Sequence, residues 1–333
     1  MSEALGLLIC TVGSLLAGVS FAWFFYWLER YRWQETYLLG CVFGWGLVAG
    51  VFANLFLGLL VPWNMAFQLE SQALEVPRRF LLVAPAVEEG LKALAILAVM
   101  LMFRKQFGYL SEAMIYGGVI AAGFAAIQNV FYLYLAGWQP AGYGGMASVF
   151  VNRVVAGGFM TTLCGAAIGA ALAWAQSRPK LWQRWHTAIT LWSGVYGVRV
   201  LRNGAVLLLS ERMGYSPVSV AGWVDGLAWL VAVMVVIAIL RREYGSFVRY
   251  LEEQVREGRI RPDQAALLRR RFLPARLRIF LPINYDATCR AVVLCSELAL
   301  RQAALSSDPD TSGIQQRVQQ EFARLVSQLS QAS

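Results

Sequence analysis

Long apolar stretches alternate with short polar connections over the first 240 residues of the chain. Seven stretches can be delimited, and they cover residues 4–28, 37–61, 80–103, 113–137, 148–176, 187–209 and 218–240. Each approaches or exceeds the about 20 residues that an α-helix needs to cross a bilayer. The pattern therefore predicts an all-α fold, a polytopic bundle of about seven transmembrane helices.

The apolar pattern ends near residue 240, and a polar segment follows. We divide the chain into a transmembrane domain, residues 1–240, and a basic, helical cytoplasmic tail, residues 241–333. In the tail, helical periodicity begins at Tyr244, and Pro262 suits the first turn of a second helix after a turn over 258–263. Two further helices are predicted over 288–305 and 314–329.

The composition indicates a membrane protein, because 58% of the residues are hydrophobic and only 15% are charged. The first stretch is too long, and its start too acidic, for a cleaved signal peptide, so we expect a retained anchor. The positive-inside rule predicts an outside N-terminus and a cytoplasmic C-terminus in the cell inner membrane, against the contrary pair Arg78 and Arg79. The basic residues that set this orientation before the tail are Arg30, Arg32, Arg104, Lys105, Arg178, Lys180 and Arg184.

The net charge of +9 is explained by this topology, so we expect no nucleic-acid partner. Residues 269–282 interleave arginines with large apolar side chains. This mixture suits anionic lipid at the membrane surface or, equally, the basic edge of a small folded domain. Glycines at close-packing spacing predict tight helix contacts, and these are the pairs Gly40/Gly44, Gly46/Gly50 and Gly165/Gly169.

The third apolar stretch contains Glu88, Glu89 and Lys92. Each charge at membrane depth costs about 2.5–3.5 kcal/mol, so these side chains must face protein or water and find partners. Lys92 is four residues from Glu88 and three from Glu89, and can pair with either, which leaves the other carboxylate for an arginine or a water. Other helices bring polar residues to the same predicted depth: Gln128, Asn129, Asn152, Arg153, Arg199, Arg202, Asn203 and Asp225. Catalysis, metal ligation and a structural polar belt all remain open at this point.

Three segments of the chain resemble motifs of one family. Glu88-Glu89-Gly-Leu-Lys92 resembles the EExxK motif of the PrsW family of intramembrane proteases, which belongs with the CAAX prenyl endopeptidase superfamily. Residues 112–132 resemble the family's second motif, an acid, a Tyr-Gly and then FxxxEN, and residues 153–162 resemble the helix that carries GHxxxT. The resemblance covers about residues 80–240 and preserves the order and spacing of the motifs.

The chain departs from the family pattern where the chemistry would be. The glutamate of the second motif is Gln128, the histidine of the third falls on Gly158, and the later helix lacks a histidine over 190–199. The single histidine, His186, is expected near the opposite face of the membrane. The resemblance suggests a divalent metal as cofactor, but a catalytic zinc takes about three protein ligands. We therefore assign no metal ligand, and the five cysteines show no zinc spacing.

The resemblance implies a catalytic set of Glu88, Glu89 and Gln128. The common depth of the polar residues adds a binding set of Lys92, Asn129, Arg153, Arg199 and Asp225. Our first hypothesis is a catalytically degenerate PrsW-like protein, which binds the transmembrane segment of a membrane partner. The alternative is an active peptidase that cuts a single-pass membrane protein, with Glu89 as base and Gln128 or Asn129 as oxyanion donor. A transporter is the third hypothesis, although the sequence has no inverted repeat.

Overall fold

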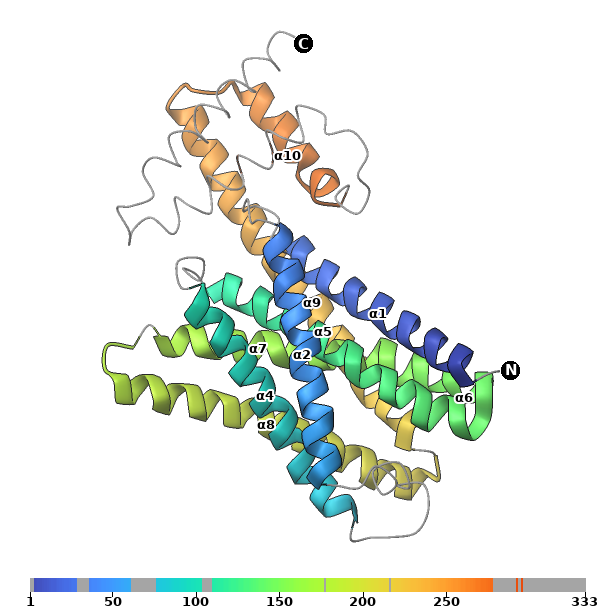
Figure 1. The fold of residues 1–333 in the computed structure, drawn as a ribbon. Helices are drawn as coiled ribbons and strands as arrows, with labels where there is room; N and C mark the ends of the chain where they lie inside the picture. Colours follow the sequence, from blue (N-terminus) through green and yellow to red (C-terminus); the bar gives the residue numbers. More distant parts are fainter. Residues whose placement is uncertain are drawn as a thin grey trace. The chain divides into compact units, whose positions relative to one another are not determined.

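The computed structural model describes residues 3–28, 36–60, 76–103, 110–176, 178–215 and 217–277, together with Val292 and Cys295. The regular structure in this part of the chain is helical without a strand, which confirms the all-α prediction. The residues form two compact units, one that extends to residue 231 and one that begins at residue 232. Figure 1 shows the helices in chain order, and each unit is described by itself below.

The seven predicted stretches are all helical where the structure describes them. Among the described residues, three helical stretches are long and apolar enough to cross a membrane, namely Glu3–Trp27, Tyr37–Leu59 and Ala113–Gln176. Together with the other apolar helices, they indicate a multi-pass membrane protein. The elements are α1 (Glu3–Leu28), α2 (Thr36–Leu60), α4 (Val76–Met102), α5 (Leu110–Phe131), η3 (Tyr132–Trp138), α6 (Gln139–Val149), η4 (Phe150–Gly157), α7 (Gly158–Gln176), α8 (Leu181–Met213) and α9 (Pro217–Arg256).

Residues 139–148, the predicted connection between the fourth and fifth apolar stretches, are helical on both sides of the point where the chain turns. Only Ala141 and Gly142 leave helical geometry inside α6. Gly142 has φ 58°, a conformation that glycine adopts without steric cost, so the chain reverses there without an open loop. The π-helices η3 and η4 flank this hairpin. Such wide turns are rare and are often found near functional sites.

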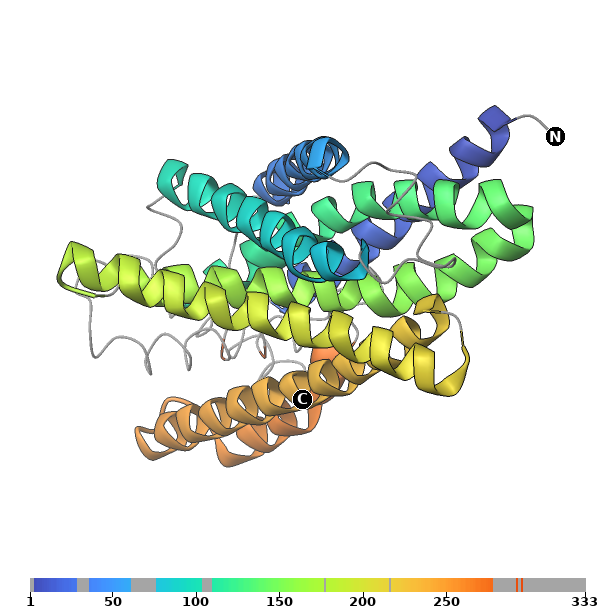
Figure 2. The same cartoon turned by 90° about the horizontal axis from the view of Figure 1, so that it is seen from below.

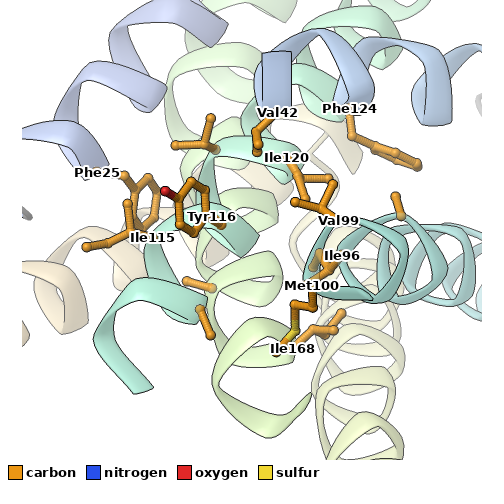
Figure 3. Close-up of a cluster of buried hydrophobic side chains, with 14 of the residues drawn as sticks. Phe25, Val42, Ile96, Val99, Met100, Ile115, Tyr116, Ile120, Phe124 and Ile168 are labelled. Atoms are coloured by element: carbon orange, nitrogen blue, oxygen red, sulfur yellow. The ribbon is translucent and has the colours of Figure 1, made fainter. Parts of the chain in front are cut away.

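Helix α5 is the central element of the first unit, since it packs against α1, α2, α4 and α7. Figure 3 shows Tyr116, Ile120 and Phe124 of α5 beside Ile96 and Met100 of α4 in one buried cluster. These five side chains are all at most 1% exposed. Because the cluster fixes α5 against α4, it also fixes the two motif segments that these helices carry.

Glycines let the backbones approach where α7 and α2 meet α5. A Cβ atom added to Gly165 would lie 2.6 Å from the carbonyl oxygen of Gly117, and one added to Gly50 would lie 2.9 Å from that of Phe124. The predicted tight packing is therefore confirmed for the pairs that contain Gly165 and Gly50. The Gly40/Gly44 pair is different, since an added Cβ would meet no described atom within 4 Å at either position.

The second unit contains a helical hairpin from the end of α9 and from α10 (Pro262–Leu277). The rings of Phe247 and Phe272 lie 5.0 Å apart between the two helices, and Arg269 Nη2 lies 2.7 Å from Glu252 Oε1. The predicted turn and the second helix at Pro262 are confirmed. Since Phe272 is only 3% exposed, this part of the basic segment packs as a folded edge.

The remaining predictions for the tail concern its boundary with the transmembrane domain and its last two helices. The predicted domain boundary at residue 240 falls inside α9, which continues without a break. Val292 and Cys295 are buried, but the helices predicted over 288–305 and 314–329 lie otherwise outside the described residues.

Candidate active site

Helix α4 supplies the acid pair and a lysine at the centre of the site. Glu88, Glu89 and Lys92 are 6%, 0% and 0% exposed. Lys92 Nζ lies 2.6 Å from Glu89 Oε1, so the structure resolves the choice that helical spacing left open. The same ammonium lies 5.3 Å from the centre of the Phe124 ring of α5, a cation–π distance. The lysine charge is therefore compensated inside the protein.

Glu88 forms its contacts with two other helices. Arg199 Nη2 of α8 donates to Glu88 Oε2 at 2.9 Å, and Gln128 Nε2 of α5 donates to Glu88 Oε1 at 2.8 Å. Arg199 Nε also lies 3.1 Å from Glu89 Oε1, an ion pair without a hydrogen bond, so the guanidinium lies between the two carboxylates. We call Glu88, Glu89, Lys92, Gln128 and Arg199 the charge cluster.

One acceptor in the charge cluster is left over. Glu89 Oε2 is buried and accepts no hydrogen bond from the residues that the structure describes. The other three carboxylate oxygens of Glu88 and Glu89 each contact a cationic or amide nitrogen. Two carboxylates and two cations also cancel in charge. The cluster therefore has no net charge, and Glu89 Oε2 can still accept a proton or a hydrogen bond.

Helix α8 is attached to α4 at a second point. Pro85 lies inside α4, one turn before Glu88, and a proline there removes one hydrogen bond of the helix. Tyr196 Oη donates to the carbonyl oxygen of Leu82 at 3.3 Å, on the other side of this proline. Helices α4 and α8 pack against each other and are neighbours in Figure 2. Tyr196 and Arg199 therefore fix α8 to the part of α4 that contains Pro85.

The remaining predicted charges form two separate groups. Arg202 Nε donates to Asp225 Oδ1 at 2.7 Å, and Nη2 of the same arginine pairs with Asp225 Oδ2. This bidentate pair joins α8 to α9, and Arg202 also donates to Asn203 Oδ1 at 3.0 Å. The Arg153 guanidinium of η4 lies 3.9 Å from the centre of the Tyr132 ring of η3. The structure therefore does not merge the predicted polar residues into one network.

Asn129 of α5 and Gly158 of α7 lie beside each other on two packed helices. Asn129 is 4% exposed, and its Nδ2 would lie 3.6 Å from a Cβ added to Gly158. The same Cβ would lie 2.7 Å from a ring carbon of Phe21, which belongs to α1. The space that a histidine would need at Gly158 is therefore filled by an aromatic ring. No signal in the sequence identified Phe21, because apolar residues cover every face of α1.

His186 lies on α8 with an exposed side chain. It precedes Arg199 by thirteen residues of continuous helix, which corresponds to about 20 Å along the axis. The single histidine of the chain therefore lies well away from the charge cluster, as its position in the sequence predicted.

The PrsW family of intramembrane metalloproteases matches residues 34–240, which is more than half of the chain. No curated protein and no solved structure matches it. The matched segment includes every residue of the charge cluster and both π-helices.

The family description implies a metal ion, and the residues present do not fit one. Among the described residues, no three His, Cys, Asp or Glu side chains come together closely enough to hold a metal. Both oxygens of Glu88 are engaged, and a metal shared with Glu89 would lie beside the buried cations Lys92 and Arg199. A catalytic zinc ion requires about three protein ligands and an open position.

With the EExxK signature in a buried cluster, and a family match across its membrane helices, the chain belongs to the PrsW family.

Proposed function

We propose that this PrsW-family protein does not hydrolyse peptide bonds and acts by binding the transmembrane segment of a membrane partner. The closed charge cluster is the observation that carries the proposal. A general base needs a free oxygen within reach of the water that it activates. Both oxygens of Glu88 already accept hydrogen bonds, and the Glu89 side chain, which has one free oxygen, is fully buried.

The other route to hydrolysis, a metal-bound water, lacks its ligands. Gln128 is an amide and can neither act as a base nor offer a metal an anionic oxygen. Gly158 has no side chain, and Phe21 occupies the adjoining space. Both departures from the family pattern therefore remove groups that a protease of this kind would use.

The fold that remains is suited to binding. A protease of the membrane must admit a polypeptide segment before it cuts it, so loss of the chemistry leaves that capacity in place. The partner then shares the bilayer with the helices of this chain, which would lie with the N-terminus outside and the basic tail near cytoplasmic anionic lipid.

An active peptidase is the second candidate, and the unpaired Glu89 Oε2 favours it. In that case Glu89 acts as the base and Gln128 or Asn129 as the oxyanion donor. Gln128 would have to exchange its contact with Glu88 for one with the substrate. The two candidates therefore differ in whether the negative charge of Glu89 is required.

The test is complementation of a deletion strain with Glu89→Gln, which keeps the shape of the side chain and an oxygen for Lys92. If the protein acts by binding, the variant restores the wild-type phenotype. Glu211→Gln, at an exposed position of α8, is the matched control, and the abundance of each variant is measured by immunoblot. A Glu89→Gln protein that is present at wild-type level but behaves like the deletion would show that the carboxylate is needed and would favour the peptidase.

A further inference from the structure

The charge cluster has an internal cation where a shared metal ion would have to bind. The Arg199 side chain is 5% exposed and contacts Glu88 Oε2 at 2.9 Å and Glu89 Oε1 at 3.1 Å. We propose that the Arg199 guanidinium is a built-in replacement for a divalent metal between these two carboxylates, and that the site excludes such metals. This inference holds whether or not the protein hydrolyses anything, so it does not rest on the proposed function.

The charges of the cluster support this assignment. Glu88 and Glu89 contribute two negative charges, and Lys92 and Arg199 contribute two positive charges at contact distance. A divalent cation added between the carboxylates would leave two uncompensated positive charges in a buried place. Unpaired buried charge is strongly unfavourable, and like charges at about 4 Å repel even with substantial dielectric screening.

The chemistry of arginine explains why one side chain can take this role. A guanidinium is planar, keeps its charge, and presents several N–H groups in a fixed fork. It can therefore contact two carboxylates at once, as Arg199 does here. A lysine is a point charge on a flexible stem, so Arg199→Lys is expected to keep the charge but to lose one of the two contacts.

The neighbouring arginine on α8 provides a matched control. Arg202 lies one turn after Arg199, and its guanidinium is held by Asp225 in a bidentate pair. Its substitution removes the same charge from the same helix without touching Glu88 or Glu89. Asp225 alone offers a metal only one carboxylate.

The experiment is a Co²⁺ titration of the purified, metal-stripped full chain in detergent micelles, followed by the visible absorption of the bound ion. Wild type and Arg202→Met are expected to show no saturable Co²⁺ absorption. Arg199→Met is expected to bind Co²⁺ at least ~100-fold more tightly than wild type, because a repelling charge is gone and Glu88 Oε2 is released while Glu89 Oε2 is already unpaired. The double variant Glu88→Gln/Arg199→Met is expected to lose this binding.

Saturable Co²⁺ binding by wild type that Glu88→Gln or Glu89→Gln abolishes would overturn the proposal, as would a folded Arg199→Met that gains no Co²⁺ affinity. If Arg199→Met fails to fold because of its uncompensated charge, the charge-balanced Glu88→Gln/Arg199→Met decides. If the double variant folds, Arg199 serves as the counter-charge of Glu88, whereas a double variant that also fails to fold assigns Arg199 to packing and overturns the proposal. Neither result affects the complementation readout, so failure of this inference and failure of the proposed function are separable.

Discussion

The pair between Glu88 and Arg199 should dominate the link between α4 and α8, and its strength can be worked out from the structure. Arg199→Met removes the charge and leaves a carboxylate whose side chain is 7% exposed. Breaking a buried ion pair by deleting one partner typically costs about 3–5 kcal/mol. The contact distance of 2.9 Å and an effective dielectric constant of about 20 give a Coulomb energy of about 6 kcal/mol, slightly above this range. We therefore expect Arg199→Met to lower the free energy of unfolding by about 3–5 kcal/mol.

The companion variants define a double-mutant cycle. Glu88→Gln keeps an oxygen acceptor and leaves Arg199 paired with Glu89, so it should cost only about 1–3 kcal/mol. Glu88→Gln/Arg199→Met removes both charges and should cost about as much as Glu88→Gln alone. The expected coupling energy between the two positions is therefore at least about 2 kcal/mol.

The assay is reversible unfolding of the purified chain in mixed detergent micelles, monitored by circular dichroism. Leu201→Met is the control, because Leu201 is 74% exposed on α8 and should tolerate the change within about 0.5 kcal/mol. If the stability losses of Glu88→Gln and Arg199→Met simply add in the double variant, the coupling energy is zero. That result would show that the two side chains do not stabilise each other. An Arg199→Met protein as stable as wild type would show the same.

Two further variants test other contacts by the same unfolding assay. Asp225→Asn should lower the free energy of unfolding by about 3–5 kcal/mol, because it leaves the Arg202 charge without its carboxylate partner. Adding Arg202→Met to Asp225→Asn should restore most of this stability. A double variant less stable than either single variant would contradict the pairing. Gly165→Leu should cost at least about 1–3 kcal/mol, because its Cβ would lie 2.6 Å from the carbonyl oxygen of Gly117. Gly40→Leu, where the added Cβ meets no described atom within 4 Å, should be close to neutral, and equal losses at both positions would contradict the packing between α5 and α7.

The sequence predicted the helices well because apolar length is a direct consequence of the bilayer's thickness. The connection predicted over residues 139–148 is a helical hairpin. The sequence could not give its form, because a single glycine with φ 58° is enough to reverse the chain. Backbone conformation at one residue leaves no trace in a hydrophobicity pattern.

The candidate site could be located from the sequence, but its contacts could not be assigned. Charged residues at similar depth in several helices indicated that partners exist, yet depth does not give the rotation of each helix about its axis. Sequence reasoning therefore could not choose Arg199 over Arg153 or Arg202 as the partner of Glu88. Only the packed helices make that choice, and the same holds for Phe21, which fills the space beside Gly158.

The proposed function of this PrsW-family protein is to bind a membrane partner without cutting it. The most direct test is to map the termini of all membrane proteins by quantitative proteomics in the native host, comparing wild type, the deletion and the Glu89→Gln complement. If the protein binds without cutting, no membrane protein changes its length among the three strains, and the abundance of the partner changes in the deletion alone. A single-pass protein that is cut in wild type and accumulates uncut in both other strains would contradict it.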